Sequence, residues 1–313
     1  MPATAKTRSP SRRFASTTVR AGQNTFDGIS ASRRRFLRSS ASVVLVSGLG
    51  SALLSACGGG NLDADQPDAP RLASVSNFRD VAGLGAGYAT VDGKQMRRGA
   101  FYRANVLTLS SADEAAIDKL GITLVYDLRT PGEIARSADV LPGGASSQTL
   151  NVLGTSDFVA PALDTAAAGV EFMEAQARDY VTGAAQRAAY GALLTHLADG
   201  AGAQLFHSNA GKDRAGWVAA LLLGIANVPL DVIMQDYLLS NTYLAQSINA
   251  QTETLRAQDG DVVETPLLEV QENYLQAGFD QVQASYGTMA NYLTRGLGMS
   301  QTTIDRLRSR LVS

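Results

Sequence analysis

Cysteine is nearly absent from this chain, which has one thiol, Cys57, among its 313 residues. A single cysteine excludes an internal disulfide and a cysteine-rich metal site. Long apolar runs are also lacking: the charge-free stretch from about Ala41 to Ala56 has roughly 16 residues, whereas a membrane-spanning helix needs about 20. A permanent membrane span is therefore the weaker interpretation of this stretch. We also expect no metal and no cofactor.

Acidic residues are scarce in the N-terminal segment. Residues 1–57 hold nine Lys and Arg residues but a single acid, Asp27. The rest of the chain carries 18 of the 27 basic and 28 of the 29 acidic residues, a net charge of −10. Such a domain lacks the basic stripe that neutralises nucleic-acid phosphates, so we expect no nucleic-acid partner. Any anion that it binds must be met by a local cluster of donors.

The N-terminal segment has the features of a bacterial export signal. Ser32-Arg33-Arg34-Arg35-Phe36-Leu37 is a twin-arginine pattern, and the apolar stretch that follows it ends in Leu54-Ser55-Ala56-Cys57. This ending resembles the lipobox of bacterial lipoproteins, in which the cysteine is lipidated. We expect residues 1–57 to be a twin-arginine signal with lipobox. The protein would then be exported, with Cys57 anchoring it by lipid to a membrane on the periplasmic side.

A basic run beside a chance thiol is the alternative interpretation of the same residues. Residues 58–74 are rich in Gly, Asp, Pro and Ala and show no periodicity, which predicts a flexible linker. From residue 75 to the end we find no internal repeat and no strong break. The sequence therefore predicts one domain over residues 75–313.

Short apolar runs alternate with helical patterns in this domain. Residues 124–129 and 203–207 are typical of buried strands that run into loops. Helices are predicted over 111–120 with Ser110 or Ser111 as cap and Gly121 as stop, over 165–198 as one or two helices, from 217, and from Pro229 to about Ser247. Strands alternating with helices predict an α/β fold, with a mainly parallel sheet flanked by helices and extra helices in the C-terminal half. Tyr126 and Trp217 are expected in the core, and His196 receives no role.

The loop after the second predicted strand can bind phosphate. It reads His207-Ser208-Asn209-Ala210-Gly211-Lys212-Asp213-Arg214-Ala215-Gly216 and leads into an apolar helix. Strand, loop and helix together place a row of backbone N–H groups and a helix N-terminus at one point. Arg214 offers a planar fork for two phosphate oxygens, Lys212 adds a second positive charge, and the glycines allow close backbone approach.

With this loop, the sequence resembles the cysteine-dependent tyrosine phosphatases, in which a Cys and an Arg bracket five loop residues. The Ala-Gly-Lys-Asp-Arg form is similar to bacterial enzymes of dual protein and phosphoinositide specificity. Further landmarks follow in family order: Asn77-Phe78-Arg79-Asp80-Val81-Ala82-Gly83-Leu84, Asp92-Gly93, Arg97-Arg98-Gly99, Tyr102-Arg103, Asp127-Leu128-Arg129 with Glu133, and Asp236-Tyr237-Leu238-Leu239-Ser240-Asn241.

The resemblance implies a tyrosine-phosphatase-like fold and a role for each loop residue. Arg214 would stabilise the transferring phosphoryl group, and Asp213 or Asp127 would protonate the leaving oxygen. His207 would tune the nucleophile, although a buried structural histidine fits equally well. The expected ligand is a phosphorylated protein or another phosphoester, cradled by the loop amides. The phosphate-binding residues would be Ser208, Asn209, Ala210, Gly211, Lys212, Asp213 and Arg214.

Two positions depart from the family pattern. Ser208 stands where the family has its nucleophilic Cys, and Ala215 stands where it usually has a Thr or Ser that assists turnover. A serine hydroxyl stays protonated in such a loop, so turnover is expected to fall by a factor on the order of 10⁶ while phosphate binding survives. An active phosphatase with other chemistry and a structural envelope lipoprotein with a vestigial site are the two alternatives.

Overall fold

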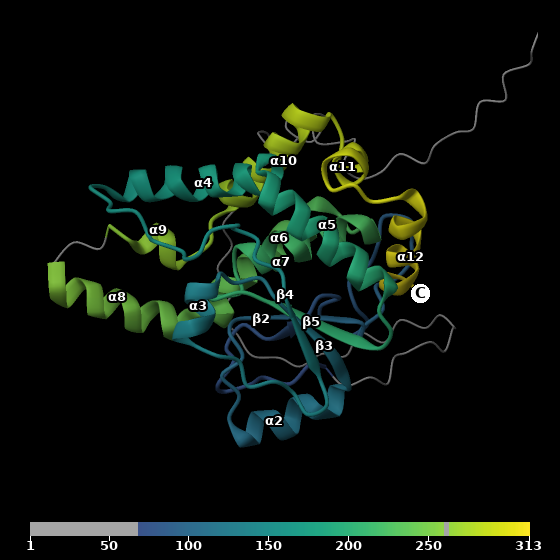
Figure 1. The fold of residues 1–313 in the computed structure, drawn as a ribbon, viewed down its shortest axis with the longest axis horizontal. Coiled ribbons are helices and arrows are strands. Elements are labelled where there is room, and N and C mark those ends of the chain that lie inside the picture. The colour runs from purple at the N-terminus through teal and green to yellow at the C-terminus, as the bar shows by residue number, and fades with distance from the viewer. Residues whose placement is uncertain (1–67, 260–262) are drawn as a thin grey trace, which may run out of the picture.

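The computed structural model describes residues 68–259 and 263–313, which form a five-stranded sheet with helices on both faces (Figure 1). The strands are β1 (Arg79–Asp80), β2 (Phe101–Ala104), β3 (Ile122–Asp127), β4 (Ser146–Thr149) and β5 (Ala203–His207). They lie in the order β1-β2-β5-β3-β4, and every neighbouring pair is parallel except β1 with β2. The predicted α/β fold with a mainly parallel sheet is confirmed.

The central strand β5 is wholly buried, in keeping with its apolar sequence between two parallel neighbours. Its last residue, His207, pairs with Ala104 of β2 on one side and Asp127 of β3 on the other. The carboxyl ends of three strands therefore meet at one edge of the sheet. The loop that begins at Ser208 leaves from the middle of this edge, where open α/β sheets bind their ligands.

Local signals fix the helices around β3. Helix α2 (Ser111–Ile117) begins where the Ser110 side chain accepts a hydrogen bond from Asp113 N, and a 3₁₀ turn (Asp118–Leu120) extends it. Gly121 ends this turn in the left-handed conformation, with φ 62°. After β3, helix α3 (Pro131–Arg136) starts with a capping box between Thr130 and Glu133. The predicted helix over 111–120 is thus confirmed, with Ser110 as its cap.

Most of the remaining helices lie on the sheet face opposite α2 (Figure 1). Helix α6 (Arg214–Ala226) is buried along nearly its whole length, because helices cover it on the side away from the sheet. The others, in chain order, are α4 (Ala166–Thr182), α5 (Ala184–Asp199), α7 (Leu230–Tyr243), α8 (Ala245–Asp259), α9 (Thr265–Leu268), α10 (Glu272–Tyr286), α11 (Met289–Asn291) and α12 (Gln301–Leu311). A π-helical turn spans Tyr292–Gly296.

The hydrophobic core has a large part among these helices and a smaller part around α2. Trp217 packs against Phe279 and Tyr292, with ring centroids 5.6 and 6.3 Å apart. Trp217 and Tyr126 are both buried, as expected. The prediction of a single helix from Pro229 to about Ser247 is wrong. The chain leaves the helical conformation at Leu244 (φ −96°, ψ 2°), and this residue separates α7 from α8. The Leu244 side chain is buried.

The first described residues lie against the domain. The backbone N–H groups of Ala73 and Ser74 donate to the Asp113 carboxylate at 3.2 and 2.7 Å. The predicted export signal of residues 1–57 with Cys57, and residues 58–67 of the predicted linker, lie outside the described residues. Among the residues that the structure does describe, no helix is long and apolar enough to cross a membrane.

Candidate active site

In the loop from Ser208 to Asp213, three consecutive carbonyl groups are turned towards the rest of the domain. The oxygens of Asn209, Ala210 and Gly211 each accept a hydrogen bond from a group outside the loop. The donors are, in that order, the Val106 N–H at 3.0 Å, the Asn77 side-chain amide at 3.0 Å and the Arg103 guanidinium at 2.6 Å. The N–H groups of residues 209–213 donate to no acceptor in the described chain. These amides are left for a ligand, as an anion cradle requires.

Gly211 allows the loop to lie this close to strand β2. Its φ is +69°, and a Cβ atom built on it would lie 2.2 Å from the Ala104 carbonyl oxygen. Helix α6 begins at the end of the loop, and its N-cap residue Asp213 makes no side-chain capping bond. The first-turn amides and the positive end of the helix dipole therefore remain available to a bound anion.

Arg214 is held in place by Glu133 of α3. Its two terminal nitrogens donate to the two carboxylate oxygens at 2.7 and 2.6 Å, and one of them also lies 3.4 Å from the Leu128 carbonyl oxygen. Burial alone would raise the pKa of Glu133, but hydrogen bonds from Arg214 and Thr130 lower it overall. Arg214 thus stays charged and fixed in orientation, which is how a guanidinium best meets a phosphoryl group.

A second buried network supports the loop from behind. Arg103, with its side chain fully buried, donates to the Gly211 carbonyl and lies 3.3 Å from Asp236 Oδ2. Asp236 also lies 3.6 Å from Arg79 Nε and accepts a hydrogen bond from the Tyr88 hydroxyl at 3.2 Å. Burial first, and then the neighbouring Arg79, lower the pKa of Arg103 to about 9. The loop conformation therefore depends on one carboxylate shared by two guanidinium groups.

Lys212 and Asp213 form a pair at the rim. Lys212 Nζ donates to both carboxylate oxygens of Asp213, at 3.0 and 2.9 Å, and to the Glu269 carbonyl at 3.3 Å. Lys212 is buried, and Asp213 is 22% exposed at its side chain. Lys212 thereby connects the loop to the chain segment after α9.

The loop forms one wall of a cavity of about 650 Å³. All the predicted phosphate-binding residues line it except Gly211: Ser208, Asn209, Ala210, Lys212, Asp213 and Arg214. Ser208 is only 2% exposed and lies at the end of β5. No described carboxylate or imidazole accepts a hydrogen bond from its hydroxyl group. The cavity volume lies within the range of about 300–1,000 Å³ that is typical of small-molecule sites.

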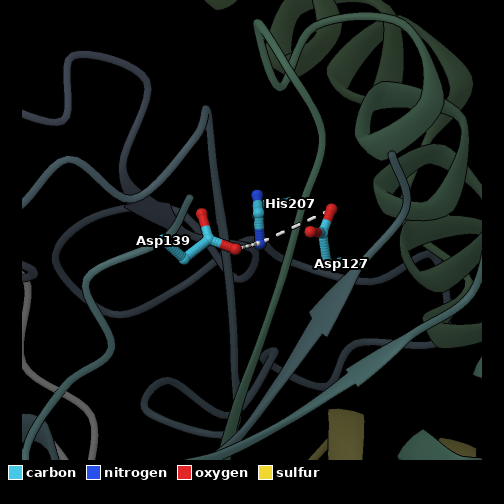
Figure 2. A group of neighbouring side chains, drawn as sticks. All are labelled: Asp127, Asp139 and His207. Carbon is cyan, nitrogen blue, oxygen red and sulfur yellow. Dashed lines mark ion pairs between the residues drawn. The ribbon is translucent and has the colours of Figure 1, made fainter. Parts of the chain in front are cut away.

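Of the candidate catalytic residues, Asp127 does not line this cavity. Figure 2 shows it beside His207 and Asp139: His207 Nε2 lies 3.8 Å from an Asp127 oxygen and 3.1 Å from an Asp139 oxygen, without the alignment of a hydrogen bond. The ligand atoms of these three residues are close enough to share a metal ion. However, Arg129 already binds both carboxylates, at 2.9 and 2.8 Å, and supplies the positive charge that a cation would bring.

Sequence reasoning missed the roles of Glu133 and Arg103. Both were identified only as landmarks of a resemblance, with no partner assigned. The capping-box pattern at Thr130 and Glu133 predicts the start of α3, but it does not reveal the pairing with Arg214, which lies 81 residues later. Arg103 in a buried strand was a detectable signal, because a buried guanidinium requires a partner.

Known proteins are similar in sequence to most of this chain. The tyrosine phosphatase family model matches residues 70–313. A Cupriavidus necator protein named "Putative tyrosine-protein phosphatase" is 35% identical over 254 residues, covering 74% of this chain and 89% of that protein. The triple specificity protein phosphatase PtpB of Mycobacterium tuberculosis is 30% identical over 285 residues, covering 77% and 98%. A tyrosine-protein phosphatase of Nostoc commune is 32% identical over 225 residues, covering 68% and 74%. The chain belongs to the tyrosine phosphatase family.

Proposed function

We propose that this protein binds phosphoesters at the loop of residues 208–214 and hydrolyses them very slowly or not at all. The observation that carries the proposal is the row of unpaired amides at residues 209–213 beside the fixed guanidinium of Arg214. Phosphate oxygens need several donors that converge on one point, and this loop supplies backbone and side-chain donors together. The ligand would be a phosphorylated protein or another phosphoester, by analogy with the family.

The reason for slow turnover is the residue at the nucleophile position. A cysteine in such a loop is activated because its pKa falls from about 8.5 into the range of about 3.5–7.5. Ser208 has an alcohol in place of a thiol, and the described residues offer its hydroxyl no base. Ala215 likewise lacks the hydroxyl that the family usually carries there. Loss of a nucleophile in hydrolases lowers turnover by a factor on the order of 10⁶, whereas the donors that bind phosphate are untouched.

Asp213 is the better of the two candidate acids. It lines the cavity, whereas Asp127 pairs with Arg129 outside it. To donate a proton to a leaving oxygen, Asp213 has to be released from Lys212, which could turn towards a bound phosphate. Any activity restored by a new nucleophile should therefore depend on Asp213 and not on Asp127.

The test is phosphate release from phosphotyrosine peptides and small phosphoesters by the natural protein and by Ser208→Cys. We expect no release above background by the natural protein and clear release by the cysteine variant. Turnover by the natural protein that Ser208→Ala leaves unchanged and Arg214→Lys abolishes would instead indicate a working phosphatase with another nucleophile. Absence of activity in both proteins, together with absence of phosphate binding, would indicate a vestigial site.

We also propose that the protein is exported and anchored to a membrane through lipidated Cys57. The support is the order of twin-arginine pattern, apolar stretch and lipobox in residues 32–57. Mass spectrometry of the protein from its native host should find an N-terminal peptide that begins at a lipid-modified Cys57, and the protein should sediment with membranes. A Cys57→Ser variant that remains membrane-bound would contradict the anchor.

A further inference from the structure

The charged side chains that line the cavity are paired, with one exception. Arg214 is bound by Glu133 at 2.6 and 2.7 Å, and Lys212 is bound by Asp213 at 2.9 and 3.0 Å. The fifth charged residue of the lining is Glu264. The two pairs are neutral in sum, so Glu264 gives the lining a net charge of −1.

Glu264 lacks a described partner. Its Oε2 atom is inaccessible to water and accepts no hydrogen bond, and no described Lys, Arg or His lies within salt-bridge distance of it. It stands at the N-cap of α9 without making a side-chain capping bond. An uncompensated carboxylate against a partly buried wall is costly, and a ligand that supplies a donor or a positive charge would relieve that cost.

The phosphate cradle and Glu264 lie on different elements of the same cavity, and much of the surface around them is apolar. Side chains from the loop before α4, from α4, from α8 and α9, and from Leu244 between α7 and α8 contribute to it. They include Leu153, Phe158, Met173, Leu244, Leu255 and Leu267. Such a surface accommodates a ring or an aliphatic chain between two polar ends.

We propose that Glu264 is a specificity-determining residue that selects phosphoesters whose apolar part carries a positive charge, as in a phosphotyrosyl peptide with a neighbouring Lys or Arg. The inference rests on the proposed phosphate binding at residues 208–214 and adds the chemistry of the rest of the ligand. The phosphoryl group meets the loop amides and Arg214, the ring contacts the apolar wall, and the cation pairs with Glu264. A ligand with a carboxylate in the same place is repelled.

Three aryl phosphates that differ only in the para substituent provide the test. They are phenyl phosphate, which has none, tyramine phosphate, which ends in an ammonium group, and 3-(4-phosphonooxyphenyl)propionate, which ends in a carboxylate. Their dissociation constants for the natural protein are measured by calorimetry at neutral pH and low salt. We expect the ammonium ligand to bind about tenfold more tightly than the carboxylate ligand, with phenyl phosphate between them.

The Glu264→Gln variant keeps the shape of the side chain and removes its charge, so it should bring the three constants together. The matched control is Glu253→Gln on α8, because Glu253 is 71% exposed, pairs with Arg256 and does not line the cavity. This control should keep the tenfold preference. Equal binding of the three ligands by the natural protein, or a preference that persists in Glu264→Gln, would overturn the inference while leaving phosphate binding in place. If none of the three binds, or Arg214→Lys changes nothing, the proposed function itself is wrong and the inference falls with it.

Discussion

Replacing Asp236 by Asn should destabilise the protein strongly, although Asp236 does not line the cavity. The carboxylate is 2% exposed and lies between Arg79 and Arg103, at 3.6 and 3.3 Å. Both guanidinium groups are buried, with side-chain exposures of 4% and 0%. Removing their shared negative charge leaves two like charges near each other with no counter-charge.

The size of the effect follows from the cost of an unpaired buried charge. Breaking a buried ion pair by removing one partner typically costs about 3–5 kcal/mol. Asp236 raises the pKa of Arg103, which is nevertheless lowered to about 9 by burial and by Arg79, so the variant should lower this pKa further. Since Arg103 also holds the Gly211 carbonyl, phosphate binding should weaken together with stability.

Urea unfolding followed by circular dichroism measures this prediction, with Asp231→Asn as the control. Asp231 is exposed in the first turn of the same helix, so its loss should cost only about 0.3–1 kcal/mol through the helix dipole. A loss below about 1 kcal/mol for Asp236→Asn, or equal losses for the two variants, would refute the account of a shared buried counter-charge.

Three further predictions concern the loop and the sheet edge. Gly211→Ala should lower the free energy of unfolding by more than about 2 kcal/mol in urea and abolish phosphate binding. The control Gly85→Ala, at φ +60° in open space, should lower it by about 1–2 kcal/mol and leave binding unchanged, and similar losses for both would contradict a steric role of Gly211. Glu133→Ala should lower the melting temperature, because Arg214 loses its counter-charge. Saturating phosphate should raise the melting temperature of this variant more than that of the natural protein, since the ligand replaces that counter-charge, and equal rises would argue against the pairing. Burial raises the pKa of Asp80 from 3.8 to about 6, so the folded state keeps a proton that the unfolded state loses as the pH rises. Stability relative to Asp80→Asn should therefore fall by about 2 kcal/mol between pH 4 and pH 6, and a flat difference in urea unfolding would contradict this.

Much of the fold could be predicted because its signals are local. The strand at 203–207, the cap at Ser110 and the stop at Gly121 depend on residues within a few positions of each other. Strand β4 was not predicted, because its residues Ser146–Thr149 are polar and largely exposed and lie at the edge of the sheet. The break at Leu244 was missed as well, since no Pro or Gly marks it in the sequence.

In the candidate site too, local features could be predicted from the sequence and contacts between distant segments could not. The strand, the loop and the helix that begins at Arg214 could be predicted, because they are formed by consecutive residues. The residues that hold the loop in place come from distant segments, such as Glu133 for Arg214 and Asp236 for Arg103. Their positions in the sequence do not show that they lie close together in the fold. Asp127 and Asp213 could not be ranked either, because the order depends on which carboxylate lines the cavity. Glu264 was not predicted as a site residue, because the sequence does not show that it lines the cavity.

The central claim is that phosphate binding persists without the cysteine nucleophile. The most direct measurement is calorimetric titration of the natural protein and of Arg214→Lys with a phosphotyrosine peptide, with released phosphate assayed in the same samples. Arg214→Lys keeps a positive charge for Glu133, and a melting curve shows that it is folded. The account predicts saturable binding by the natural protein without release, and its loss in Arg214→Lys. Absence of binding by the natural protein, or rapid release of phosphate by it, would contradict the account.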